Sequence, residues 1–111
     1  MSKFDEKIAL YQGAMKGLGI SFDADLFAKV TKGLGPSIYK ADAETVSGSD
    51  AKELATVKNN FLIKKLGLSD GAKLDNAIDV VMEKMGKSNR NKYRAIVYYL
   101  LVKELGQESK Y

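Results

Sequence analysis

Residues 95–102 read Ala-Ile-Val-Tyr-Tyr-Leu-Leu-Val, the longest apolar run of the chain. The run is too short for a bilayer, which takes roughly 20 residues to span. A helix that is apolar on every side lies at the centre of a fold, although the β-branched and aromatic side chains here also allow a buried strand. Since no other segment alternates apolar and polar residues, such a strand would lack a partner. We therefore expect a central helix over about 89–105, with Ser88 as its N-cap.

Outward from this run, glycines preceded by Leu or Met divide the chain into helices. A glycine just past a helix adopts the left-handed conformation without a steric penalty. Lysines fall in the turns before these glycines, where a cation meets the negative end of the helix dipole. The glycines are Gly19, Gly35, Gly67, Gly86 and Gly106. They predict five helices, over about 3–17, from after Asp23 to 34, from after Asp50 to about 66, from after Ser69 to 85, and over 89–105.

Local signals support the starts of two of these helices. Asp23 is a typical N-cap, and Phe22 before it is placed to pack on Phe27 as a hydrophobic staple. Asp50, with Glu53 three residues later, resembles a capping box. Residues 37–49 follow Gly-Pro and show no clear period, so we expect mostly irregular chain with at most a short helical turn. The fold class is thus all-α, an irregular helical bundle.

Length and composition suit one domain over residues 1–111, because 45% apolar residues are enough for a single core. The chain has no Cys, which excludes disulfides and Cys-ligated zinc, and no His, the commonest general base and metal ligand. We expect no cofactor, no metal and no enzymatic activity; catalysis would have to use carboxylates, Lys, Tyr or Ser. Residues 1–7 lead into no apolar stretch, so we expect a cytoplasmic protein without a secretory signal.

The positive charge is concentrated in the second half of the chain. The net charge is +4, but residues 1–50 hold six Lys against seven acids, whereas residues 51–111 hold twelve Lys and Arg against seven. Several of these cations surround the expected start of the last helix, where the helix dipole favours acids instead. Free backbone N–H groups, a Ser hydroxyl and Arg together can bind an anion. The candidate anion-binding residues are Lys87, Ser88, Asn89, Arg90, Lys92 and Arg94.

These cations also have simpler interpretations, because neighbouring acids such as Asp42 or Glu44 can neutralise them, or water can solvate them. If they bind a ligand, nucleic acid and acidic proteins are the expected partners. The alternative function is a structural homo-oligomer with no anionic ligand. A second polar group, Lys58-Asn59-Asn60 with Lys64 and Lys65, either extends the basic surface or forms a solvated helix face. The tyrosines at 93, 98 and 99 either stack on bases or belong to the core or a subunit interface.

Three stretches resemble a known family. They are Thr-Lys-Gly-Leu-Gly-Pro-Ser-Ile-Tyr at 31–39, Val-Lys-Asn-Asn-Phe-Leu-Ile-Lys-Lys-Leu-Gly-Leu at 57–68, and Ser-Asn-Arg-Asn-Lys-Tyr-Arg at 88–94. Together with the chain length, they resemble the bacterial family named domain of unknown function 2853. The resemblance implies a compact bacterial protein and extends over nearly the whole chain. It implies no activity, ligand or catalytic residue.

Overall fold

The computed structural model describes residues 3–47, 50–86, 89 and 92–111, with only the backbone described at 41 and 42. The described chain is mostly helical and contains no strand, which confirms the all-α prediction. Its elements are α1 (Lys3–Gly17), α2 (Ala24–Gly33), the 3₁₀-helix η1 (Gly35–Tyr39), α3 (Ala41–Glu44), α4 (Ala51–Thr56), the π-helix η2 (Val57–Lys65), α5 (Ala72–Met85), α6 (Arg94–Glu104) and the 3₁₀-helix η3 (Glu108–Lys110).

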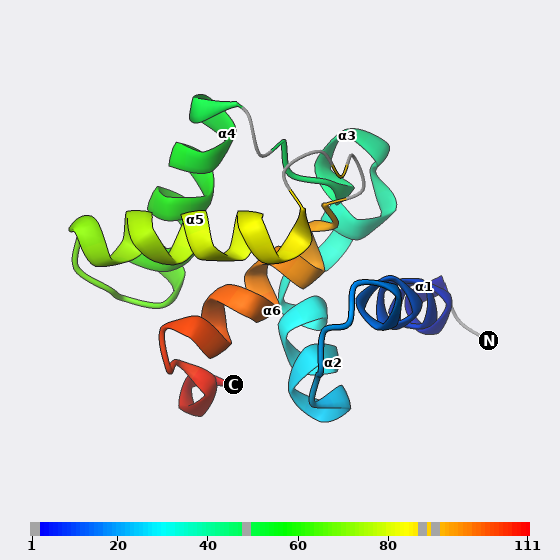
Figure 1. The fold of residues 1–111 in the computed structure, drawn as a ribbon. Coiled ribbons are helices and arrows are strands. Elements are labelled where there is room, and N and C mark those ends of the chain that lie inside the picture. The colour runs from blue at the N-terminus through cyan, green and yellow to red at the C-terminus, as the bar shows by residue number, and fades with distance from the viewer. Residues whose placement is uncertain (1–2, 48–49, 87–88, 90–91) are drawn as a thin grey trace.

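The apolar run at 95–102 lies in α6, and all eight of its side chains are buried. This helix packs mainly against α2 and α5, so it lies between them in the middle of the fold (Figure 1). The expected central helix is thereby confirmed, and the strand alternative is wrong. Tyr98 and Tyr99 are buried, and the Tyr99 hydroxyl accepts a hydrogen bond from the backbone N–H of Asp23 at 2.7 Å. For these two tyrosines the core interpretation is the correct one.

The expected helix stops are also confirmed. All five predicted glycines have positive φ, and among the described residues no other residue type does. Asp23 caps α2 by accepting hydrogen bonds from the backbone N–H groups of Asp25 and Leu26. The Phe22 and Phe27 rings lie with centroids 6.4 Å apart, as the hydrophobic staple predicts. Local chemistry thus fixes where these helices begin and end.

The helix after Asp50 has the predicted extent but changes type along its length. Asp50 caps α4 by accepting from the N–H groups of Lys52 and Glu53. After Thr56 the hydrogen bonding becomes that of a π-helix, and the N–H of Leu66 still bonds to the carbonyl of Phe61, five residues back. A π-helix is rare and occurs frequently at functional sites. Sequence periodicity did not predict this change.

Two predicted helix starts need correction. α5 begins at Ala72 with Gly71 as N-cap and no side-chain cap, so Ser69 is not the cap. α6 begins at Arg94 with Tyr93 as N-cap, several residues later than expected. The reason is tertiary: Tyr93 forms an isolated antiparallel bridge with Thr45, and the N–H of Val46 donates to the Lys92 carbonyl at 2.7 Å. These backbone groups are therefore used outside the helix.

The segment at 37–49 contains more structure than expected, because it holds most of η1 and the four-residue α3. Both elements pack beside each other, and α3 also contacts α6. Within the described residues, no helix has the length and apolar character that crossing a membrane requires.

Candidate functional site

A pocket of about 370 Å³ lies beside the first turn of α6. Its walls come from the end of α2, from η1, α3, the α4–η2 helix and α6, and from Tyr111. Two cations line it, Arg94 and Lys65, and the described lining residues include no Asp or Glu. The volume is at the small end of the range for ligand sites, about 300–1,000 Å³. The pocket is therefore suited to a small molecule.

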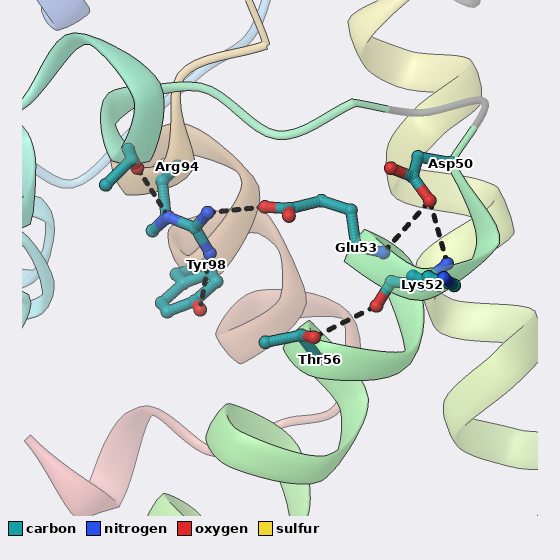
Figure 2. Close-up of polar contacts among 7 residues, drawn as sticks. Asp50, Lys52, Glu53, Thr56, Arg94 and Tyr98 are labelled. Atoms are coloured by element: carbon teal, nitrogen blue, oxygen red, sulfur yellow. Dashed lines mark hydrogen bonds and ion pairs between the residues drawn. The ribbon is translucent and has the colours of Figure 1, made fainter.

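Arg94, the first residue of α6, is held by three partners from different parts of the chain. Its Nε donates to the carbonyl oxygen of Ala43 at 2.6 Å, and its Nη2 donates to Oε1 of Glu53 at 2.5 Å. Its Nη1 donates to the Tyr98 hydroxyl at 3.0 Å. Figure 2 shows the guanidinium with its bonds to Tyr98 and to Glu53. Arg94 thus joins α3 and α4 to α6.

The Arg94 guanidinium remains charged in this setting. Burial lowers its pKa, but the contacts with Tyr98 and Glu53 outweigh burial and raise the pKa above its usual value. A guanidinium has five N–H donors, so these three hydrogen bonds leave two N–H groups for another acceptor. The Glu53 carboxylate neutralises most of the Arg94 charge. Water screens this ion pair only weakly, because the two side chains are only 12% and 28% exposed. Arg94 can therefore donate hydrogen bonds to a ligand but contributes little net charge.

Lys65 supplies the uncompensated charge. It is the last residue of the π-helix, it is exposed, and no hydrogen bond or ion pair joins its ammonium to any described residue. The ammonium lies against Gly33 at the end of α2, where an added Cβ would be 3.4 Å from Nζ. The same Cβ would be 3.8 Å from the Tyr111 ring. Gly33, Lys65 and Tyr111 therefore meet at one edge of the pocket.

Aromatic rings form an apolar wall of the pocket. Phe61 and Tyr98 are stacked, with ring centroids 3.9 Å apart and planes at 14°. The Arg94 guanidinium lies 5.7 Å from the centroid of the Tyr98 ring, within range of a cation–π interaction. Val30 and Leu34 of the α2 end add aliphatic surface. The pocket combines an apolar wall with a small number of hydrogen-bonding groups, as ligand sites commonly do.

Of the predicted anion-binding residues that the structure describes, which are Asn89, Lys92 and Arg94, only Arg94 lines this pocket. Lys92 is 3% exposed and donates to the backbone carbonyl of Asn89 at 2.5 Å, and the Asn89 side chain donates to the Met85 carbonyl. Neither Asn89 nor Lys92 lines the pocket. The remaining predicted residues, Lys87, Ser88 and Arg90, lie outside the described part of the chain. For Arg94, the simpler interpretation is correct, because an acid neutralises it. That acid is Glu53 rather than Glu44.

The second polar group of the sequence contributes more to the site. Lys65 and Asn60 line the pocket, whereas Lys58 pairs with Asp70 and Asp75 at 2.6 and 3.0 Å. The spacing of these residues along the chain did not predict that Asn60 and Lys65 line the pocket while Lys58 pairs with acids elsewhere, because the direction of each side chain depends on the π-helix. The other polar lining residues, Ser37, Thr56 and Tyr111, were not among the predicted site residues.

A second polar cluster lies away from the pocket. The Tyr11 hydroxyl donates to Oε2 of Glu44 at 2.5 Å, and the Lys7 ammonium lies 2.6 Å from the same oxygen. Burial raises the pKa of Tyr11 well above its usual value, and the bond to Glu44 raises it further. Tyr11 is fully buried, and the Lys7 and Glu44 side chains are 29% and 15% exposed, so this cluster joins α3 to α1 near the surface. Among the described residues, no group of three acids could hold a metal ion.

With this geometry established, the chain can be compared with known proteins. The model of the family described as "Protein of unknown function (DUF2853)" matches residues 10–109. This chain is a member of the DUF2853 family. The resemblance drawn from the sequence is thereby confirmed. Apart from Tyr111, every residue that lines the pocket lies inside the region that the DUF2853 model matches. No curated protein matches the chain.

Proposed function

We propose that this chain is a non-enzymatic binding module of the bacterial cytoplasm that holds an anionic ligand in the pocket at the start of α6. The observation that carries the proposal is that Lys65, which has no partner among the described residues, lines the pocket beside the donors of Arg94, and that no Asp or Glu side chain is among the described lining residues. In a partly enclosed site, a cation attracts an anion more strongly than it does in water. The lack of Cys suits a reducing compartment.

Binding is favoured over catalysis by the titration behaviour of the lining groups. A general acid or base works best with a pKa near the ambient pH. Here the pKa of Arg94 is raised, and burial followed by the charge of Tyr98 raises the pKa of Tyr111 as well. Both pKa values are displaced away from neutrality. Arg94 and Tyr111 therefore act as donors with fixed protons, which suits recognition of an anion.

The test is an NMR titration of the amide-labelled protein at low salt. Inorganic phosphate and small organic acids are expected to shift the amide resonances of Gly33, Thr56 and Lys65, with affinity falling as salt rises. Lys65→Met should weaken this binding, whereas Lys64→Met should not, because Lys64 is exposed and does not line the pocket. A response to no anion, or an equal response in both variants, would contradict the proposal.

Nucleic acid and acidic proteins are larger anionic partners that the basic second half of the chain also suits. A single-stranded oligonucleotide added in the same titration distinguishes them. Salt-dependent shifts confined to the pocket favour the small-ligand form of the proposal. Shifts that spread over residues 84–92 and leave the pocket residues unchanged favour a macromolecule and contradict the pocket as the site.

Self-association is the alternative function, and one observation favours it. Leu10 and Leu18 on or next to α1 are 46% and 37% exposed, and Tyr39 is 46% exposed. Apolar side chains on a surface are sites where a second subunit can pack. Sedimentation velocity at micromolar concentration tests this function. A homo-oligomer that Leu10→Lys converts to a monomer supports it, and a monomeric wild type counts against it.

A further inference from the structure

The charges around the pocket limit the kind of anion that it suits. Arg94 and Lys65 line the pocket, and the Glu53 carboxylate is bonded to Arg94. Among the side chains, the two cations less this one carboxylate leave one net positive charge. A single net charge balances a monoanion, whereas a phosphate monoester carries about two negative charges at pH 7. A carboxylate therefore matches the pocket better than a phosphate does.

The two cations also differ in what they offer to that carboxylate. The Arg94 charge is already balanced by Glu53, with Nη2 and Oε1 2.5 Å apart. Lys65 has no partner among the described residues and stands at the exposed edge beside Gly33. A carboxylate is thus expected to pair with Lys65. The two remaining N–H groups of Arg94 then serve a polar atom deeper in the ligand.

The rest of the lining calls for an apolar ligand body. Phe61 and Tyr98 line the pocket as a stacked pair, each less than a tenth exposed, and Val30 and Leu34 add aliphatic side chains. An apolar group of a ligand is expected to pack against the parts of these side chains that face the pocket. The volume of about 370 Å³ limits this body to a small group.

We propose that the ligand is a small amphipathic monocarboxylic acid, whose carboxylate pairs with Lys65 and whose apolar body packs against Phe61 and Tyr98. This inference rests on the proposed function, and it narrows the anion from any small anion to one class. All three residues that it names, Lys65, Phe61 and Tyr98, line the described pocket.

The experiment titrates the full chain by NMR with three probes of one shape. Phenylacetate is the monoanion, phenylacetamide is its neutral counterpart, and phenyl phosphate carries close to two charges at about pH 8. Phenylacetate is expected to bind about two- to fivefold more tightly than the amide, since only the carboxylate forms an ion pair with the exposed Lys65, and such a pair contributes up to about 1 kcal/mol. Phenyl phosphate is expected to bind no more tightly than phenylacetate.

Two variants test the assignment of charges. Lys65→Met should abolish the preference for acid over amide, because it weakens the binding of phenylacetate more than the binding of phenylacetamide, and Lys64→Met should leave both unchanged. Glu53→Gln raises the net charge at the pocket by one. It should therefore increase the affinity for phenyl phosphate more than the affinity for phenylacetate, by about tenfold in the ratio.

The outcomes separate the two proposals. If phosphates bind at the pocket and carboxylates do not, an anion-binding module remains and the monocarboxylate inference is overturned. If acid and amide bind equally and no phosphate binds, the pocket is merely apolar and both proposals fail. If none of the probes shifts the pocket amides, both fail as well. Retention of the acid preference in Lys65→Met overturns the assignment of the carboxylate to Lys65.

Discussion

Arg94→Met tests whether this side chain holds α3 and α4 onto α6. Methionine keeps most of the aliphatic stem but removes the donors to Ala43, Tyr98 and Glu53. Each bond to a neutral acceptor contributes about 1 kcal/mol. The partly exposed ion pair adds about 1 kcal/mol, less than a buried pair does. We expect a loss of about 3 kcal/mol, a large share of the roughly 5–15 kcal/mol that stabilises a domain.

Glu53→Gln isolates the charge of this interaction, because glutamine keeps a carbonyl acceptor for Nη2 of Arg94. We expect it to lower the free energy of unfolding by about 1 kcal/mol or less. The double variant should then show a coupling of about 1 kcal/mol between the two positions. Urea unfolding followed by circular dichroism measures all four proteins, and an unchanged m-value validates the comparison.

Lys84→Met is the matched control, since Lys84 is half-exposed and its ammonium lies 3.6 Å from Glu104. Removing this surface pair should change the free energy of unfolding by less than about 0.5 kcal/mol. If Arg94→Met costs no more than Lys84→Met, the guanidinium does not hold the three elements together. A coupling energy near zero would show that Glu53 and Arg94 act independently.

Three further predictions concern single side chains. Gly33→Ala should stabilise α2 by about 0.5–1 kcal/mol and weaken pocket binding several-fold, because the added methyl lies against Lys65. Its control is Gly13→Ala, which has open space around it and should stabilise α1 by a similar amount while leaving binding unchanged. Thermal unfolding measures the stability of each variant, and titration measures its binding. Asp50→Ala removes the N-cap of α4 and should cost about 1 kcal/mol in urea unfolding, and no change would mean that water replaces the cap. Tyr11 has a raised pKa in the folded state, so its contribution to stability is present below its unfolded pKa of about 10 and is lost as the pH rises above that value. Tyr11→Phe should flatten this alkaline decline, and an identical decline in both proteins would refute the linkage.

The helix boundaries that the sequence predicted correctly depend on neighbouring residues alone. Gly19 and Gly106 end their helices because only glycine takes positive φ without a penalty, and that holds in any fold. Asp23 and Asp50 begin theirs because a short carboxylate reaches N–H groups two and three residues ahead. The burial of 95–102 followed from its composition, since no face of that helix suits water.

The incorrect boundaries have a different cause. Ser88 was expected to begin the last helix, but backbone groups of residues 92 and 93 pair with residues 45 and 46, and α6 begins only at Arg94. The π-helix depends likewise on packing. Its wider turns make the backbone hydrogen bonds less favourable, and the burial of Val57, Phe61 and Leu62 offsets this loss. Neither effect is visible in a window of the sequence.

The amino-acid sequence alone determined the helical class, the helix stops, the central position of the last helix and the excess of cations in the second half. Only the tertiary structure decided which cations share a site. Arg94 meets Glu53 across 41 residues, and Lys65 meets Gly33 at the end of another helix. Contacts between residues far apart in the chain depend on how the helices pack, so the pocket could not be predicted from spacing, whereas caps and glycine stops act within a single turn.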